Sequence, residues 1–372
     1  MKIPSPADEK DICKEIIVRA LGNLDKLSVE ASFNNAVRNF RERPEGCFEL
    51  YQRVLWSLPH VNRVFPGLQV KSREAVDLAL LVGPDPFSLP KWIIDRIKPL
   101  LGENGLSNIL KRKTWVRINT LRGCREATIN KISERNYKFK VDDDVDFLLE
   151  WISPKISSTK EFRNGLLIPQ DKSSVFVIRA LDPKPGETIL EIGSAPGTKT
   201  SLIQQFTENQ AYVIGVDTSS HRIEVERKLL KRWGVKNVDL VLADGANVSL
   251  RNVDKILIDA PCTNSGTINV DPSIPLRLTK EELMKLKRIQ KEILKNAMTQ
   301  EVPVVYSTCS LFPEEGELQV ESYSDLLVKL TDDPRHMGYR KSKVWMRVMR
   351  TYPHVDFSEG FFIAKIDPSR KN

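Results

Sequence analysis

The chain has 372 residues, of which 41% are hydrophobic and 28% charged, and its formal net charge is +8 at pH 7. This length allows two or three domains, and the composition is ordinary for a globular protein. The five cysteines are scattered without a CxxC pair, so we expect neither a disulfide framework nor a metal site. No apolar run approaches the roughly 18 residues that span a membrane, and no signal peptide follows Met1, so we expect a cytoplasmic protein.

Residues 1–89 are predicted to form a helical accessory domain. Apolar residues recur there at intervals of three and four, for example Ile12, Ile16 and Ile17. The cluster Gly83-Pro84-Asp85-Pro86 interrupts this pattern and predicts a domain boundary. Nothing in this part indicates catalysis.

Residues 90–165 are predicted to form a small α+β domain. The expected elements are a helix at 90–101, strands at 114–121, 137–141 and 147–152, and a polar helix at 126–134. The run Lys111-Arg112-Lys113 belongs to an excess of basic residues that is spread along the chain. Such a run fits either a solvated surface or contact with the phosphates of a polyanion.

From residue 166 to 372, strand and helix patterns alternate. This alternation predicts an α/β domain with a doubly wound, mostly parallel sheet and helices on both faces. The strand candidates are 188–192, 212–216, 238–242, 255–258, 302–306 and 361–366. A right-handed crossover at every step would place all the carboxyl ends of these strands along one edge, where we expect ligand and chemistry.

The stretch Thr188–Thr200 combines an apolar strand, a small-residue turn that begins at Gly193, and the start of a helix. This layout holds nucleoside-bearing ligands at the end of a parallel strand. The turn is neither GxGxxG nor a P-loop, so a nucleoside triphosphate is a poor fit. Asp217, at the end of the second strand, is placed to accept hydrogen bonds from ribose hydroxyls. Asp244, after the third strand, fits either contact with an adenine amine or a simple Asp-Gly turn.

Two cysteines, Cys262 and Cys309, each follow an apolar strand although 47 positions separate them. Parallel strands would bring both thiols to the same cleft. Buried apolar cysteine is the ordinary alternative, but hydroxyl, proline and turn residues flank both positions and favour reactive thiols. A disulfide between them is disfavoured in a reducing compartment.

Two thiols beside a nucleoside-type site suggest one particular reaction. Cytosine C5 is too weak a nucleophile to take a methyl group unaided, but a thiolate that adds to C6 turns the ring into an enamine whose C5 can attack a sulfonium methyl. A carboxylate and an ammonium group that grip the base would stabilise the charge that develops. Removal of the C5 proton and expulsion of the thiol would complete the turnover.

Three motifs carry a family resemblance: Ile192–Thr200, Asp259–Thr267 and Ser307–Ser310. Ile168–Ser174, Trp92–Ile94, Arg117–Leu121 and the ending from Arg350 to Lys365 also match. On these motifs the chain resembles the Sun/Fmu-type RNA (cytosine-5) methyltransferases from about residue 90 onward. The helical N-terminal part looks only loosely like the NusB-like extension that some members carry.

The resemblance implies a class I S-adenosylmethionine-dependent methyltransferase that forms 5-methylcytosine in tRNA or rRNA. It implies that Cys309 is the nucleophile that attacks C6 and that Cys262 promotes product release. Lys199 and Asp259 are implied to contact the cytosine. The implied cofactor-binding residues are Gly193, Ser194, Ala195, Pro196, Gly197, Thr198, Lys199, Asp217, Arg222, Asp244 and Asp259.

The chain departs from the family at two places. Many members carry Cys-Ala-Ala-Pro-Gly-Gly-Lys where this chain has Gly193–Lys199, and Thr198 in place of the second glycine narrows the freedom of the backbone. Asn264-Ser265 stands where many members carry other small residues, and it affects no role assigned above.

Two other functions are alternatives to this reaction. An RNA-binding ribosome-assembly factor could keep the fold without the chemistry, although both cysteines, the lysine and the carboxylate are present. A methyltransferase that acts on amines or on protein glutamine would carry an Asn/Asp-Pro-Pro-aromatic motif, which Asp259-Ala260-Pro261-Cys262 lacks. We expect a monomer without a metal ion, and the sequence does not identify the RNA.

Overall fold

The computed structural model describes residues 6–40, 44–250 and 252–371. Its contacts group the chain into two compact units. The first comprises the residues up to Leu110 together with Thr267–Lys280, and the second comprises Lys111–Gly266 and the residues from Glu281 on. The division into three domains with boundaries at 89 and 165 stays a prediction.

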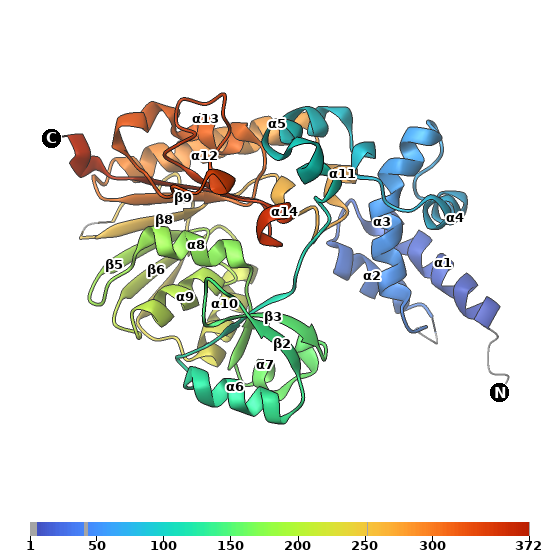
Figure 1. The fold of residues 1–372 in the computed structure, drawn as a ribbon, viewed down its shortest axis with the longest axis horizontal. Helices are drawn as coiled ribbons and strands as arrows, with labels where there is room; N and C mark the ends of the chain where they lie inside the picture. Colours follow the sequence, from blue (N-terminus) through green and yellow to red (C-terminus); the bar gives the residue numbers. More distant parts are fainter. Residues whose placement is uncertain (1–5, 41–43, 251, 372) are drawn as a thin grey trace. The chain divides into compact units, whose positions relative to one another are not determined.

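The first unit is helical, as the sequence predicts (Figure 1). Its helices are α1 Pro6–Asn23, α2 Val29–Val37, α3 Cys47–Val64, α4 Arg73–Val82, α5 Lys91–Ser107 and the short α11 Ile274–Arg277. The side chains of Ser28 and Ser72 accept hydrogen bonds from backbone N–H groups three residues ahead and so cap α2 and α4. Phe33 stacks on Tyr51 in the core, with ring centroids 5.6 Å apart.

The segment Thr267–Lys280 follows the first cysteine motif in the sequence but packs with the helices of the first unit. The indole Nε1 of Trp56 donates to the carbonyl oxygen of Ile268 at 3.4 Å. Leu276 packs against the helical core. The chain therefore leaves the second unit directly after Gly266 and returns to it in the helix that begins at Lys280.

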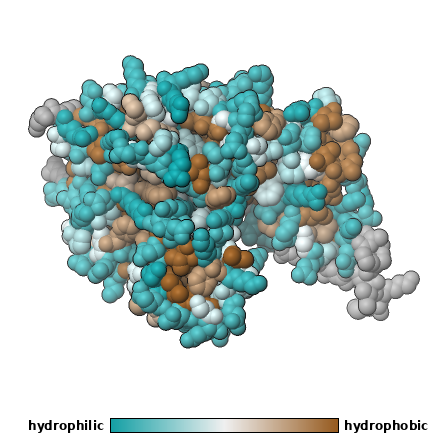
Figure 2. Space-filling view, viewed as in Figure 1, coloured by the Kyte–Doolittle hydropathy of each residue, from teal (hydrophilic) through white to brown (hydrophobic). Residues whose placement is uncertain are grey.

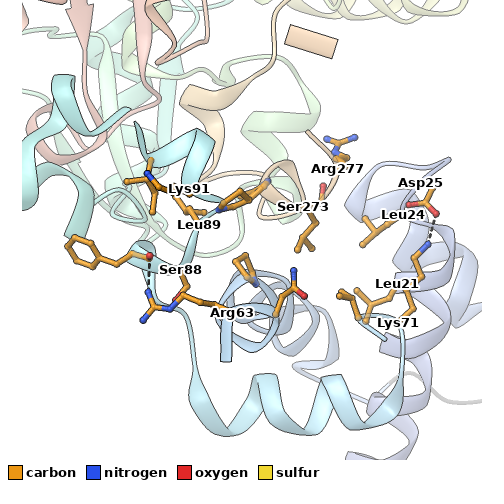
Figure 3. Close-up of a pocket in the computed structure, with 18 of the residues that line it drawn as sticks. Leu21, Leu24, Asp25, Arg63, Lys71, Ser88, Leu89, Lys91, Ser273 and Arg277 are labelled. Atoms are coloured by element: carbon orange, nitrogen blue, oxygen red, sulfur yellow. Dashed lines mark hydrogen bonds and ion pairs between the residues drawn. The ribbon is translucent and has the colours of Figure 1, made fainter. Parts of the chain in front are cut away.

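A cavity of about 800 Å³ lies within the first unit, with apolar side chains such as Leu21, Leu24 and Leu89 in its wall (Figure 3). Four basic side chains also line it, and each is paired with a carboxylate. The pairs are Lys71–Asp25, Lys91–Asp95, Arg277–Asp271 and Arg63–Asp85. Because each of these four positive charges is paired with a carboxylate, the lining of the cavity is nearly neutral and mixes apolar with charged side chains. The described residues that line it do not include the unpaired basic side chains that a phosphate site needs.

Hydrophobic side chains also reach the surface of the first unit. Figure 2 shows apolar atoms over α4 and the adjoining end of α3. Leu81 is 79% exposed, and Val64 and Phe65 are exposed as well. Within the described ranges, none of the helices combines the length and the apolar character that crossing a membrane takes.

The second unit contains two sheets. The smaller one is antiparallel, with the strand order β2-β3-β1-β4. Its strands are β1 Trp115–Ile118, β2 Lys138–Val141, β3 Leu148–Ser153 and β4 Leu167–Pro169, and its helices are α6 Arg125–Glu134 and α7 Lys160–Arg163. Arg117 of β1 is fully buried and donates to Gln205 Oε1 at 2.5 Å and to Ser201 Oγ at 2.6 Å. The small sheet is thereby joined to the helix Thr198–Phe206.

The larger sheet has eight strands in the order β10-β12-β9-β8-β5-β6-β7, with β11 paired to β12. Its strands are β5 Thr188–Ile192, β6 Tyr212–Asp217, β7 Val238–Leu242, β8 Lys255–Asp259, β9 Val304–Thr308, β10 Leu327–Val328, β11 Met349–Thr351 and β12 Phe361–Ile366. Its helices are α8 Lys172–Leu181, α9 Thr198–Phe206, α10 Ser220–Trp233, α12 Lys280–Met298, α13 Glu317–Val320 and α14 Pro353–Asp356. The predicted α/β class with a mostly parallel sheet is confirmed.

Helices cover both faces of this sheet (Figure 1). Leu190 and Ile258 point to the face covered by α12, whereas Ile189 and Leu257 point to the face covered by α8 and α9. Because neighbouring residues are buried on opposite faces, the central strands read as continuous apolar runs.

One expectation about the sheet is wrong. Strands β8, β5, β6, β7 and β9 are parallel, but β12 runs antiparallel to β9. The carboxyl end of β12 therefore lies at the opposite edge from the others. Its first residues, next to Glu359 and Gly360, lie beside the carboxyl end of β9, since Phe362 pairs with Thr308.

A fully buried ion pair fastens α13 to β11. The guanidinium of Arg350 donates to Glu317 Oε1 at 2.7 Å and to Oε2 at 2.6 Å, and a third bond reaches the carbonyl oxygen of Ser310 at 2.8 Å. Both side chains are 0% exposed. Bidentate geometry and the third acceptor compensate for the loss of hydration.

Replacing Arg350 by leucine is expected to lower the free energy of unfolding by about 3–5 kcal/mol, because it leaves the Glu317 carboxylate buried without its partner. Chemical denaturation followed by circular dichroism measures this change. The double variant Arg350→Leu/Glu317→Leu is the control and should recover a large part of the loss. A double variant as unstable as the single one would contradict this explanation.

Candidate active site

The loop Gly193–Gly197, here called the glycine loop, turns sharply between β5 and α9. Gly193 has φ +81°, and a Cβ atom there would lie 2.3 Å from the carbonyl oxygen of Asp259, so only glycine fits. The N–H of Gly197 bonds to the carbonyl oxygen of Ser194 at 2.8 Å and closes the turn around Ala195 and Pro196. Gly197 has φ +93° and precedes the first residue of α9.

Thr198 is that first helical residue. The left-handed backbone position is thus taken by Gly197, and threonine at the next position costs no backbone strain. The departure from the family pattern at Thr198 is compatible with the same loop conformation.

Lys199 and Asp259 form an ion pair at the centre of the site. Lys199 Nζ lies 2.7 Å from Asp259 Oδ2 and 5.3 Å from the centre of the Phe361 ring. Burial opposes the charge of Lys199, but the Asp259 carboxylate outweighs this and raises the pKa of the ammonium group. The positive charge is therefore held in a partly dehydrated position.

The two thiols meet, as the sequence predicts. Cys262 Sγ lies 3.2 Å from Cys309 Sγ, and both cysteines are free and partly exposed. They come from the loops after the neighbouring parallel strands β8 and β9. The hydrogen bond with Cys262 and burial raise the pKa of Cys309 well above its ordinary value, so this cysteine rests as a neutral thiol.

A buried carboxylate, Glu315, ties the two cysteine loops together. Its Oε1 accepts from the N–H of Thr263 at 3.0 Å and from Gln290 Nε2 at 2.9 Å. Its Oε2 accepts from the hydroxyls of Thr263 at 2.5 Å and Ser310 at 2.6 Å. Because Thr263 follows Cys262 and Ser310 follows Cys309, one side chain fixes the separation of the two thiols.

Gly266 adds a backbone junction to this arrangement. Its N–H bonds to the carbonyl oxygen of Cys309 at 3.0 Å, and its own carbonyl accepts from the N–H of Gly360 at 2.8 Å. A Cβ atom at position 266 would lie 1.8 Å from the Gly360 oxygen. The glycine of the first cysteine motif is required for this contact.

A cavity of about 650 Å³ opens along the carboxyl ends of β5, β6, β7 and β8. Several residues predicted for the site line it, namely Gly193, Asp217, Arg222, Asp244, Asp259, Cys262 and Cys309. The predicted loop residues 194–199 lie behind it: Ser194 bonds to Glu226, and the Ala195 carbonyl oxygen accepts from Arg222.

Asp217 and Asp244 differ in how their carboxylates are used. Asp217 is buried, and its Oδ2 accepts no hydrogen bond although Arg222 Nη1 lies 3.2 Å away. Asp244 is exposed and accepts from the N–H of Ala246 at 3.0 Å, which is the turn geometry considered for it from the sequence. Asp217 therefore offers the freer acceptor to a ligand.

Two further acids, Glu191 and Glu226, are buried beneath the glycine loop. The Thr200 hydroxyl lies 2.7 Å from Glu191 Oε2 and 3.2 Å from Glu226 Oε1. Burial, together with the charge of Glu226, raises the pKa of Glu191 to about 8, and burial raises the pKa of Glu226 to about 7. These carboxyls are coupled to the loop through Thr200 and Ser194.

Sequence reasoning missed several residues of the site. Asn264, Ile289, Glu292 and Ile293 line the cavity, and Glu315 organises the cysteine loops. Ile289 and Ile293 lie on α12 and also pack in the core of the larger sheet. Glu359 precedes the antiparallel strand, and burial together with Asp171 raises its pKa to about 8. Only the reversed direction of β12 brings it near Lys199 and Cys309.

Comparison with known proteins gives consistent matches. The family model described as 16S rRNA methyltransferase RsmB/F matches residues 178–367. The tRNA (cytosine(72)-C(5))-methyltransferase of Pyrococcus horikoshii is 35% identical over 57% of this chain and 55% of the relative. The chain thus spans about half the length of that relative.

Two other matches cover more of their counterparts. The tRNA (cytosine(49)-C(5))-methyltransferase of Pyrococcus abyssi is 30% identical over 68% of this chain and 88% of the relative. The crystal structure of a methyltransferase homologue protein from Pyrococcus horikoshii superposes with a TM-score of 0.64 at 32% identity, over 74% of this chain and 94% of that one.

The buried acids predict how stability depends on pH. The folded-state pKa values of Glu191 and Glu226 lie above the ordinary 4.5, so the stability linked to their protons is complete below about pH 4.5 and is lost as the pH rises through about 7 and 8. Glu191→Gln, which keeps the acceptor for Thr200, should flatten the fall of the thermal midpoint between pH 6 and 9.

Scanning calorimetry across this range measures the effect. Glu224→Gln, a change at a half-exposed glutamate of α10, is the control and should leave the slope unchanged. Parallel curves for the wild-type and Glu191→Gln proteins would contradict the assignment.

Proposed function

The chain belongs to the family described as 16S rRNA methyltransferase RsmB/F, and from this membership we propose that it methylates C5 of a cytosine in RNA. The observation that carries the proposal is the pair of thiols 3.2 Å apart, beside the ion pair of Lys199 and Asp259. A nucleophilic thiol, a second sulfur and an ammonium–carboxylate pair are the groups that the C5 reaction needs.

We propose S-adenosylmethionine as the cofactor, which supplies a methyl group activated as a sulfonium. The cavity of about 650 Å³ has room for a nucleoside, and the buried Asp217 Oδ2 lacks the donor that a ribose hydroxyl would offer. Gly193 lines this cavity at the end of β5. Ile289 and Ile293 provide an apolar wall for a flat base.

In the proposed reaction, Cys309 loses its proton, and its sulfur forms a bond to C6 of the cytosine. The electron pair of the C5–C6 double bond moves towards C5. With S-adenosylmethionine bound, C5 would bond to the methyl carbon while the carbon–sulfur bond of the sulfonium breaks and its electron pair stays on the sulfur. The ammonium group of Lys199 and the carboxylate of Asp259 hold the polar edge of the base and balance the charge on the ring.

Release reverses the first step. A base removes the C5 proton, and the electron pair of the C5–H bond restores the C5–C6 double bond. The bond from C6 to the sulfur of Cys309 then breaks, and its electrons return to sulfur. The position of Cys262 beside Cys309 supports a role for it in this release.

Two classes of RNA, tRNA and ribosomal RNA, are candidates for the substrate. The relatives above are named for tRNA, whereas the family description names 16S rRNA. The target base must leave its stack to reach the thiols.

Lys113, in the basic run considered for phosphate contact, is paired with Glu150 Oε2 at 2.8 Å. The assembly-factor alternative is not favoured, since it gives no use to the thiol pair.

Labelled methyl transfer from S-adenosylmethionine to unmodified tRNA and, separately, to ribosomal RNA tests the function. Label in 5-methylcytosine of one RNA is the expected result. Transfer to neither RNA by a protein that binds the cofactor would contradict the proposed activity and favour the assembly-factor alternative.

The two cysteines should respond differently to substitution. Cys309→Ala should lower methyl transfer by at least about a thousandfold, because the nucleophile is lost. Cys262→Ala should instead accumulate a covalent protein–RNA adduct that survives denaturing electrophoresis. The exposed Cys124→Ala is the matched control and should behave like the wild-type protein. An adduct in Cys309→Ala would reverse the assignment.

The cofactor site has its own test. Asp217→Ala should weaken binding of S-adenosylmethionine by roughly 10–100-fold, because a hydrogen bond to a charged group is lost. Isothermal titration calorimetry measures this without RNA. Asp239→Ala, at an exposed position of β7 outside the cavity, is the control. Equal affinity of the two variants would contradict the role of Asp217.

A further inference from the structure

Asn264 contacts the thiol pair, although no role was predicted for it from the sequence. Its Oδ1 lies 2.9 Å from Cys309 Sγ and 3.7 Å from Cys262 Sγ. Either thiol can donate its proton to this oxygen, so the amide oxygen serves the neutral thiol form. The side chain also lines the cavity of the site.

The backbone at Asn264 is fixed in a conformation that suits few residues. Its φ is +56°, which asparagine and glycine tolerate and which β-branched residues avoid. The neighbours on both sides are buried and anchored: Thr263 bonds to Glu315, and Ser265 Oγ accepts from the N–H of Leu311 at 3.0 Å. The amide therefore stays aimed at the sulfurs.

An amide can serve both protonation states of a thiol. Its oxygen accepts from S–H, whereas its NH₂ group donates to a thiolate, which only accepts. Turning the amide about the Cβ–Cγ bond exchanges the two groups at the same position without moving the backbone. An aspartate of the same shape offers only acceptors and repels the thiolate.

We propose that Asn264 is a positioning residue for Cys309: it holds the thiol through Oδ1 and, once the proton has left to solvent, turns its Nδ2–H group to the thiolate. This proposal rests on the proposed role of Cys309 as the nucleophile. It gives the thiolate a donor at the place where it forms.

The charged and titratable groups around Cys309 make such a donor valuable. Cys262, Asp259 at the end of β8, and Glu359 before β12 all favour the neutral thiol. Lys199 of α9 carries the opposing positive charge, but it is shared with Asp259. A hydrogen-bond donor from Asn264 adds stabilisation to the thiolate alone.

The rate of alkylation of Cys309 by iodoacetamide, followed against pH and resolved by peptide mass spectrometry, tests the proposal. This reaction needs neither RNA nor cofactor, so its result is independent of whether methyl transfer is found. Asn264→Gly tolerates the positive φ and deletes the amide. It should raise the apparent pKa of Cys309 by about one unit, which is roughly tenfold slower alkylation at neutral pH.

Asn264→Asp keeps the size of the side chain and should raise the apparent pKa by at least as much. Cys124 in the same protein is the internal reference, and its profile should not move. An unchanged or lowered pKa in Asn264→Gly overturns the proposal, because the amide would then favour the thiol or neither form. If the glycine variant does not fold, an unchanged profile in Asn264→Asp overturns it as well.

Discussion

The carboxylate of Glu315 holds the two halves of the site at a fixed distance. Four donors from three elements converge on it, and two of these elements are the loops that carry Cys262 and Cys309. Burial raises the pKa of Glu315, but the four hydrogen bonds oppose this and replace the water that the carboxylate has lost. Together with the bond from the Gly266 N–H to the Cys309 carbonyl oxygen, this carboxylate ties the two loops whose sulfurs lie 3.2 Å apart.

Close backbone contacts complete what Glu315 begins. At Gly193 the loop between β5 and α9 touches the backbone of Asp259, and at Gly266 the first cysteine loop touches Gly360. Both contacts exclude any Cβ atom, so the motif glycines reflect packing between loops as well as turn formation. The Arg350–Glu317 pair then fixes the second cysteine loop from below through the carbonyl oxygen of Ser310. The cavity is therefore lined by loops that are each held at more than one point.

Most of the fold follows from local pattern, and the contacts across the site do not. Strands β5, β7 and β12 begin and end where alternation and apolar runs predict. The strand predicted at 302–306 is displaced by two residues and is β9, Val304–Thr308. The meeting of Cys262 and Cys309 follows from parallel topology. The reversed direction of β12 is invisible to periodicity, so Glu359 and Phe361 were not placed at the site. Asn264, Glu315 and Ile289 were missed for a related reason, since their roles depend on tertiary neighbours.

The protonation states of the site are set by competition among buried charges. Asp259 neutralises Lys199 and disfavours the thiolate of Cys309, and Glu359 acts on the thiolate in the same sense. In the free protein, Cys309 is therefore held as a neutral thiol, the form that is less open to oxidation and alkylation than a thiolate. A cytosine that accepts a hydrogen bond from Lys199 and donates one to Asp259 would draw the charges of this pair towards the ring. In the proposed reaction, Asp259, which disfavours the thiolate in the free protein, would thus pair with the substrate instead, and this would tie the reactivity of the thiol to occupation of the site.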